Sequence, residues 1–375
     1  MKRFLFTGIF LSAAALSFAA DTVSYRLCRI ENWAFYGTQS PTVELVAEND
    51  RGIAQILDIK CSILSNAGVP LYELLQRGTV PQKDSLAISF AFKTLEPGFY
   101  NAVLWSGERV VNSVNIAYEP EKIACEWTVE EGALPSWGDF RKLANIVSLE
   151  RRDIDPGFTL QRNKVMSGKE KNVYDFRMVS RDGKVIKGYA AFPKGAKGLK
   201  AMVTLVAAEK KGENPLADFT APANMAELVV YLVERGEGEE YFKNMLTDTQ
   251  LCIDFLSQRP EINPYGIYVQ GEGKAAACSY LSSALDERVA ASFVAAPDFT
   301  RFVENFSVES MAGKVSAPVL FGFGLQDRTS RLQEGFALYN GLKNEKEYFI
   351  FPLGSSVERN KWKYIRDTFI LRLGE

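Results

Sequence analysis

The sequence predicts an α/β protein, in which a mainly parallel sheet flanked by helices follows a small antiparallel β-sandwich. Three observations lead to this prediction. Short strand-like runs between turn residues fill the first part of the chain. Strands and helices alternate from about residue 172 onward, and a sharp glycine turn joins a strand to a helix at 267–285. Closely spaced short strands are typical of sandwiches, whereas alternating strands and helices form parallel sheets.

The N-terminal residues predict an export signal. Lys2 and Arg3 precede an apolar run, and small residues occupy positions 17, 19 and 20. This order is typical of a secretory signal peptide, with cleavage expected after Ala19. The apolar run is shorter than the ~20 residues that a membrane span needs. We therefore expect residues 1–19 to be removed, no membrane span in the mature chain, and a periplasmic or extracellular protein.

The composition excludes several classes of protein. The 375 residues are 47% hydrophobic and 24% charged, and the formal net charge is −2. Such a chain can bury a large core in one or two domains. Its balanced charge gives no reason to expect a nucleic-acid partner. The chain contains no histidine, so no imidazole can act as a base or a metal ligand. The oligomeric state is left open.

The cysteines are scattered and form no CxxC pair; they are Cys28, Cys61, Cys125, Cys252 and Cys278. Without histidine this pattern predicts no zinc site, and we expect neither a metal nor a cofactor. In an oxidising compartment one bridge could form, with Cys28–Cys61 as the candidate pair. The odd count leaves at least one thiol free, and buried, unreactive thiols are the expectation for most of them.

Residues 20–118 predict the β-sandwich domain. Alternation of apolar and polar residues is clearest at 86–92, and a hairpin is expected to turn at Ser106-Gly107. Expected strands cover 42–48, 54–64, 85–92 and the two arms of 100–118. This part of the chain carries no catalytic constellation. Packing against the rest of the protein is its expected role, with glycan binding as the alternative.

Residues 119–171 are expected to connect the sandwich to an α/β domain at 172–375. In that domain 200–208 and 226–234 read as buried strands, and 246–256 has helical spacing before a stop at Arg259-Pro260. The expected elements that follow are strands at 267–269, 288–296, 318–322 and 348–351, with helices at 274–285 and 331–342. Ligand sites of such sheets form at the carboxyl ends of the strands.

The glycine turn reads Gly271-Glu272-Gly273-Lys274-Ala275. A strand that turns sharply into a helix through G-x-S-x-G presents the nucleophilic serine of α/β-hydrolases. Here Gly273 stands at the position of that serine.

Several longer stretches carry a resemblance to one group of these enzymes. They are "VYDFRMVSRDGKVIKGYAAFPKG" at 173–195, "DFLSQRPEINPYGIYVQGEG" at 254–273 and "SAPVLFGFGLQDRTS" at 316–330. In this order they resemble the acetyl xylan esterase and cephalosporin-C deacetylase group. The resemblance implies an α/β-hydrolase fold for 172–375 and a triad built after three of its strands.

The motifs that define the group are altered in this sequence. Its R-G-Q motif is matched by Arg235-Gly236-Glu237, its G-x-S-Q-G elbow by 271–275, and its terminal H-E by Ser356-Val357. Of the three triad positions that the resemblance assigns, only one keeps its residue. Asp327 stands where the group has the aspartate that orients the histidine.

These changes predict a degenerate esterase. Gly273 has no side chain, so no acyl-enzyme can form there, and the hydroxyl of Ser356 cannot replace an imidazole base near neutral pH. We therefore expect a catalytically inactive protein with a retained pocket for a carbohydrate or an acetylated glycan. Its candidate residues are Arg235, Glu237, Glu272, Lys274 and Ser355.

Two alternatives remain open. One is an active carbohydrate ester hydrolase, a deacetylase, with an unconventional site in which Glu272 acts with Asp327, Glu237 and Lys274. The other is a structural or partner-binding protein that acts through the β-sandwich.

Overall fold

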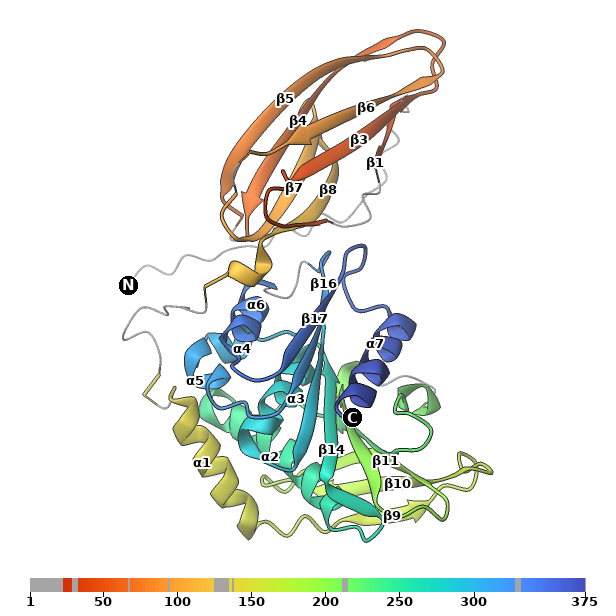
Figure 1. Ribbon diagram of the computed structural model, residues 1–375, viewed down its shortest axis with the longest axis vertical. Helices are drawn as coiled ribbons and strands as arrows, with labels where there is room; N and C mark the ends of the chain where they lie inside the picture. Colours follow the sequence, from red (N-terminus) through yellow and green to blue (C-terminus); the bar gives the residue numbers. More distant parts are fainter. Residues whose placement is uncertain are drawn as a thin grey trace.

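The computed structural model describes residues 23–28, 33–66, 68–93, 95–124, 135–136, 138–210, 215–327 and 332–374. The expected signal peptide, residues 1–19, and Cys125 lie outside this range. The chain forms two parts that follow one another along the long axis of the molecule: a β-structure above and an α/β structure below (Figure 1). The fold class predicted from the sequence is confirmed.

The upper part is built from two small sheets. One has the order β1 (Val23–Leu27), β3 (Thr42–Asn49), β6 (Asp84–Ala91). The other has the order β2 (Ala34–Phe35), β8 (Arg109–Tyr118), β7 (Gly98–Ser106), β4 (Gln55–Ser65), β5 (Pro70–Val80). All pairs are antiparallel except the short β2–β8 pair.

Alternation along the strands explains this arrangement. In β6 the side chains of Ile88 and Phe90 are buried while Ser89 between them is exposed. Ile88 stands opposite Leu45 of β3, which is fully buried. The inward-facing residues of the two sheets thus form one apolar core, as in other sandwiches.

The lower part has a 9-stranded sheet of order β17-β16-β15-β14-β12-β13-β11-β10-β9. The strands are β9 (Thr159–Arg162), β10 (Lys171–Val179), β11 (Val185–Pro193), β12 (Leu199–Ala207), β13 (Ala226–Leu232), β14 (Ile262–Glu272), β15 (Val289–Ala295), β16 (Val319–Gly324) and β17 (Lys346–Phe351). From β12 to β17 neighbouring strands are parallel, whereas β9, β10 and β11 pair antiparallel. The carboxyl ends of β14, β16 and β17 therefore lie along one edge.

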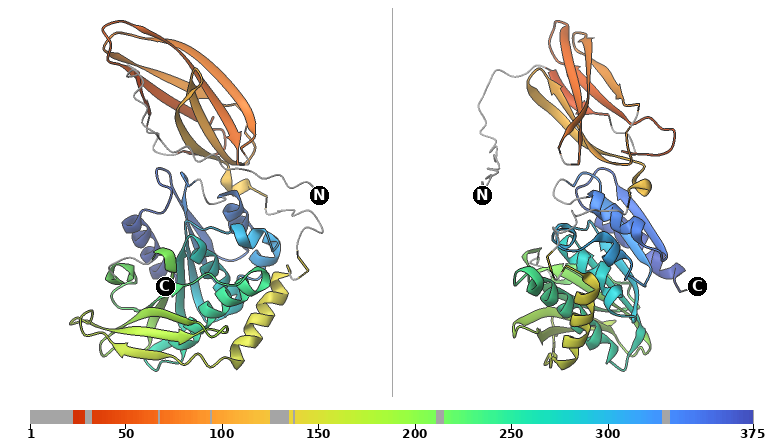
Figure 2. Two further views of the ribbon diagram at one scale, coloured as in Figure 1. Left: turned by 180° about the vertical axis from the view of Figure 1, so that it is seen from behind. Right: turned by 90° about the vertical axis from the view of Figure 1, so that its left-hand side faces the viewer.

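The helices cover the two faces of this sheet unequally (Figures 1 and 2). One face carries α1 (Phe140–Glu150), α2 (Gly238–Ser257), α3 (Lys274–Leu285), α4 (Thr300–Val303), α5 (Val308–Ala312) and α6 (Leu332–Gly341). The other carries α7 (Arg359–Arg372), whose Trp362 and Phe369 join an apolar cluster with Phe293 and Leu320. Between β12 and β13 only short turns are described, η3 (Ala208–Lys210) and η4 (Pro215–Asp218).

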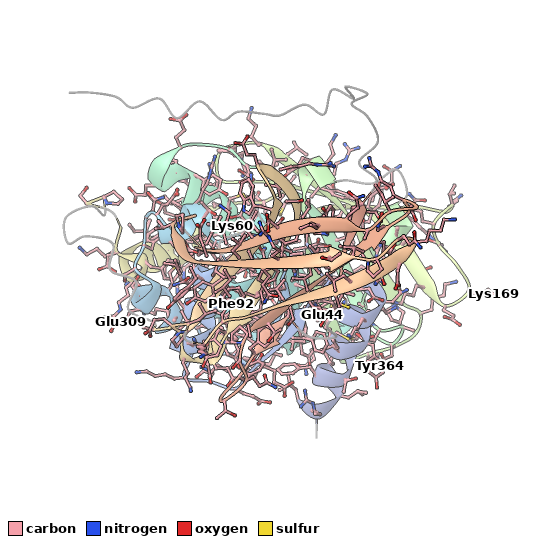
Figure 3. All side chains as sticks on the ribbon, turned by 90° about the horizontal axis from the view of Figure 1, so that it is seen from above. Glu44, Lys60, Phe92, Lys169, Glu309 and Tyr364 are labelled. Atoms are coloured by element: carbon pink, nitrogen blue, oxygen red, sulfur yellow. The ribbon has the colours of Figure 1, made fainter. Side chains whose placement is uncertain are left out.

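The sandwich is fastened to the α/β part above its parallel strands. The ring of Phe99 lies 5.1 Å from that of Phe336 in α6, and the amide of Asn340 donates to the carbonyls of Pro120 and Ile123. In the view from above, α7 with exposed Tyr364 projects beyond the sandwich strands (Figure 3). The outer side of α7 is therefore left uncovered by the sandwich.

The suggested Cys28–Cys61 bridge is wrong, because both thiols are free. Cys61 lies in β4 and is buried in the core of the sandwich, whereas Cys28 follows β1 in the opposite sheet. Cys252 and Cys278 are free and buried as well. Burial raises the pKa of the Cys278 thiol to about 12, which makes this thiol a poor nucleophile.

Candidate functional site

The turn between β14 and α3 has the backbone geometry of a strained elbow. Gly273 has φ 63° and ψ −126°, a conformation that side chains disfavour and glycine tolerates. Its N–H donates to the carbonyl of Ala295 at 3.1 Å, and its own carbonyl accepts from the N–H of Asp298 at 3.0 Å. The backbone of the elbow is thus held in place, and no side chain stands at its apex.

Gly271 shows why the elbow keeps a glycine on its strand side. A Cβ atom at this position would lie 2.4 Å from the carbonyl oxygen of Ala275, in the first turn of α3. The helix therefore passes too close to the strand for any side chain at 271. This is the packing that the first glycine of a G-x-S-x-G motif permits.

Asp327 follows β16 and lies beside the sandwich. Its N–H donates to the carbonyl of Gly324 at 3.0 Å, and its carbonyl accepts from the side-chain amide of Asn115 at 3.2 Å. It lines a cavity of ≈ 280 Å³ together with Tyr100, Asn101 and Asn115 of the sandwich. The aspartate expected in the triad thus belongs to the junction between the two parts of the chain.

A larger cleft of ≈ 690 Å³ opens beside the elbow, on the face of the sheet that carries α7. Glu272 and Ser356 both line it, so the structure brings these two predicted positions to one cleft. The other lining residues come from β12, η4 and the loop after it, β14, β15, the loop before α7, and α7 itself: Thr204, Leu205, Val206, Ala207, Ala217, Asp218, Phe219, Thr220, Gln270, Gly271, Ala295, Val357, Arg359, Asn360, Trp362, Lys363 and Arg366.

The remaining candidate residues do not line this cleft. Lys274 is paired with Glu234 at 2.7 Å, and Glu237 is exposed at the N-cap of α2. Ser355 lies over the end of β16, where a Cβ on Gly324 would be 2.6 Å from its carbonyl carbon. These residues surround the elbow at several points and do not form one pocket.

Arg235 is the centre of a buried ion-pair cluster. Its guanidinium lies 2.7 Å from the carboxylate of Asp182 and 2.8 Å from that of Asp248, and it also donates to the hydroxyl of Ser180. Asp248 lies in α2 and is fully buried. Burial raises its pKa, and the hydrogen bond from Arg235 opposes this shift. Arg235 thus ties the loop after β10 to α2.

A buried polar network forms the base of the cleft. The hydroxyl of Thr204 donates to the carboxylate of Glu227 at 2.6 Å, and the amide of Gln270 donates to Thr204 at 2.8 Å. Arg366 of α7, which is 1% exposed, donates to Gln270 at 2.6 Å and to the hydroxyl of Thr220 at 3.0 Å. Strands β12 and β14, helix α7 and the loop at 220 are thereby joined.

Glu227 holds the loop at 220 by binding backbone N–H groups of that loop. Its carboxylate accepts the N–H groups of Thr220 at 3.0 Å and Ala221 at 2.9 Å. Complete burial raises the pKa of Glu227, while these hydrogen bonds and the charge of Arg366 favour the ionised form. The loop is therefore fixed in position by a carboxylate that is itself inaccessible.

Sequence reasoning missed Glu227, Gln270 and Arg366. The available signal was Glu227 in an otherwise apolar strand, because charges are rarely buried unless they are paired. Arg366 lies in a helix with several basic residues and gave no such signal. Among the residues that the structure describes, no group of three or more Cys, Asp or Glu residues is placed to hold a metal ion. Nor does any helix in that range have the length and hydrophobicity of a membrane span.

The arrangement can bind a polar ligand, but it offers no nucleophile at the elbow. No protein-family model matches the sequence, and a search of curated proteins finds no match. Among solved structures, the chain is similar to an acetyl xylan esterase from Paenibacillus sp. R4, with 18% identity over 68% of this chain and 98% of that one and a TM-score of 0.57.

Acetyl xylan esterase 1 from Thermoanaerobacterium sp. JW/SL YS485 is similar as well, at 17% identity over 64% of this chain and 95% of that one, with a TM-score of 0.54. Similarity at such low sequence identity shows a shared fold, and one fold can host many functions. The strand order, the elbow after β14 and these comparisons agree: the chain has the α/β-hydrolase fold of the acetyl xylan esterases.

Proposed function

We propose that the protein is exported and catalytically inactive, and that the cleft beside its elbow binds carbohydrate. The observation that carries this proposal is Gly273, which occupies the apex of the elbow without a side chain. Ester hydrolysis by this fold needs an oxygen nucleophile there and a base to take its proton. The chain contains no histidine to serve as that base.

The lining of the cleft suits a sugar. Its lining includes the exposed Asn360 and the half-buried Phe219, with the largely buried Trp362 beside them. Sugars offer hydroxyls and apolar ring faces, and sites for small ligands combine an apolar lining with a few fixed polar groups. Similarity to proteins named acetyl xylan esterases supports an acetylated glycan as the ligand.

Two assays on the purified mature protein test the proposal. We expect no labelling by a serine-reactive fluorophosphonate and no release of acetate from acetylated xylotetraose above the uncatalysed rate. We also expect binding of acetylated xylotetraose in calorimetry. Substitution Asn360→Ala in the cleft should weaken this binding, while the matched change Asn66→Ala in the smaller cavity should leave it unaltered.

If the protein is instead an unconventional deacetylase, it should release acetate. It requires a carboxylate in the cleft, and Glu272 lies there at the end of β14. Robust acetate release by the unmodified protein, abolished by Glu272→Gln, would replace the inactive-protein proposal by this one. Absence of binding to any oligosaccharide, whether neutral, acetylated or charged, would remove the carbohydrate assignment.

Export is tested separately. The mature chain should begin near Ala20, because small residues at the end of the apolar run are cleavage signals. N-terminal sequencing of the protein recovered outside the cytoplasm checks this, and a chain that still begins at Met1 would contradict it.

A further inference from the structure

The cleft is lined by two cations, Arg359 and Lys363, that form no ion pair within the described part of the chain. Arg359 and Lys363 lie four residues apart in α7, so they project from the same side of the helix, about 6 Å apart along its axis. Both are exposed, and both line the cleft. Within the described part of the chain, neither takes part in an ion pair, whereas Arg372 of the same helix is paired with Glu347.

The other charged residues at the cleft make interactions of their own, and two of them, Asp218 and Glu272, are carboxylates. Arg366 donates to Asp367, Thr220 and Gln270. Asp218 accepts the hydroxyl of Tyr231 at 2.7 Å, and Glu272 is also engaged in an interaction.

Lys171 adds to the positive charge near this helix. Burial lowers the pKa of Lys171; the charge of Glu227 opposes this shift, and the charge of Lys363 adds to it. The amino group of Lys171 donates to the carbonyl of Met225 at 3.1 Å, in the segment that borders the cleft.

We propose that Arg359 and Lys363 select a sugar that carries a negative charge. This inference rests on the proposed carbohydrate function and names the class of glycan: one with a carboxylate, as in a uronic acid, or with a sulfate ester. A guanidinium binds either anion through two parallel N–H donors, and an ammonium adds a point charge. In a cleft partly shielded from water, the attraction exceeds that of the same charges on an open surface.

Arg366 holds α7 in place at this site. Its guanidinium also donates to the backbone carbonyl of Thr220 at 2.6 Å, so it fixes α7 against the loop on the other side of the cleft. Arg359 and Lys363 are therefore presented from a helix that is held by a buried network, while their own donors remain available to a ligand.

The test compares three probes on the full mature protein by calorimetry: xylotetraose, xylotetraose substituted with glucuronic acid, and xylotetraose carrying a sulfate ester. We expect at least one charged probe to bind about 10-fold more tightly than the neutral one. Arg359→Gln and Lys363→Gln should each weaken the charged complex about 3–10-fold and leave the neutral one unchanged. Added salt should reproduce this loss. The probe that binds more tightly identifies the anionic group.

The matched control is Lys361→Gln. Lys361 belongs to the same helix, but its amino group lies 4.5 Å from the ring centre of Phe349 and is not part of the cleft. Its substitution removes the same charge from α7 and should leave binding of every probe unchanged. Melting temperatures of the three variants establish that each is folded.

Three outcomes overturn the inference. The first is equal affinity for charged and neutral probes, and the second is an effect of Lys361→Gln as large as that of Lys363→Gln. Tight binding of a charged probe that neither Arg359→Gln nor Lys363→Gln weakens also overturns it, because the site then lies elsewhere. If none of the three probes, nor the acetylated oligosaccharide, binds, the carbohydrate function itself fails.

Discussion

The backbone of Asn115 and the side chain of Gln326 bind each other in both directions. The N–H of Asn115 donates to Oε1 of Gln326 at 2.9 Å, and Nε2 of Gln326 donates to the carbonyl of Asn115 at 3.1 Å. Nε2 also donates to the carbonyl of Pro352 at 2.9 Å. Since Asn115 belongs to β8 and Gln326 follows β16, one amide fastens the sandwich to the sheet edge where the triad of an α/β-hydrolase would meet.

Removing this amide should loosen the junction. Gln326→Ala leaves three backbone groups without their partner, and we expect a loss of about 1–3 kcal/mol in the free energy of unfolding. Urea denaturation measures it. The control is Gln76→Ala, which removes a single exposed hydrogen bond to the carbonyl of Ser89. Equal effects of the two substitutions would show that the junction is not held in this way.

The elbow should tolerate no side chain without cost. Gly273 has φ 63°, so Gly273→Ala is expected to destabilise the fold by about 1–3 kcal/mol. Gly52 is the control: it is exposed, and a Cβ there would meet nothing within 4 Å. Gly52→Ala should be close to neutral in the same denaturation experiment. A neutral Gly273→Ala would mean that the backbone of the elbow relaxes.

Strong local patterns made much of the fold predictable. The helix expected at 274–285 is α3, Lys274–Leu285, because a tight glycine turn marks its start and alanines fill its interior. The buried strand expected at 226–234 is β13, Ala226–Leu232. In both cases the local pattern and the tertiary environment favour the same structure.

Helix α7 and the cleft could not be predicted so easily. Basic residues interrupt the apolar spacing of α7. Its Arg366 is buried only because Thr220 and Gln270, from two other segments, and Asp367 of the same helix accept its hydrogen bonds. The cleft depends on the conformation of the segment between β12 and β13, where Pro215 and Pro222 disfavour a long helix. Its binding residues therefore come together through tertiary contacts that have no local signature.

The ion pairs of Asp286 should make stability depend on pH. Burial alone would raise the pKa of Asp286, but hydrogen bonds from Arg288 and Arg151 hold it below its ordinary value. Its ionised form therefore contributes stability above the unfolded pKa of about 4, and this contribution is lost as the pH falls through the lower pKa of the folded state.

Asp286→Asn is expected to cost about 2 kcal/mol at pH 7, because it removes the charged hydrogen bonds to Arg151 and Arg288 and leaves these guanidinium groups with Asp254 as their carboxylate partner. The difference from the unmodified protein should shrink below about pH 4. Denaturation at several pH values checks this, with exposed Asp50→Asn as the control. A deficit that is the same at pH 3 and pH 7 would argue against the ion pairs as its cause.

Ligand binding in the cleft should change little between about pH 6 and 8, since unperturbed carboxylates and lysines do not titrate there and the chain has no histidine. Glu227 is the group to examine if a steep midpoint is found, because burial raises its pKa. The hydrogen bonds that Glu227 accepts favour its ionised form. We therefore expect binding affinity to stay nearly constant over this pH range. Titration of Glu227→Gln would then show whether this carboxyl group is responsible.

The last prediction concerns restored chemistry. Gly273→Ser alone should give almost no esterase activity, because its hydroxyl would have no base, and Ser356→His alone would have no hydroxyl to activate. The double variant should exceed the sum of the single variants, since the members of a triad act as a unit. Acetate release from acetylated xylotetraose and fluorophosphonate labelling provide the two measurements.

Asp327 decides how far such activity can rise. Its carbonyl accepts a hydrogen bond from Asn115, and the residue lines the cavity against the sandwich. Its carboxylate would therefore have to accept a hydrogen bond from the new imidazole while its backbone stays in the junction. Adding Asp327→Asn to the double variant should therefore lower the activity at least about 10-fold if the aspartate orients the base. Retained activity in that triple variant would mean that the new serine–histidine pair works without it, and a double variant no better than Gly273→Ser would show that position 356 does not reach the elbow.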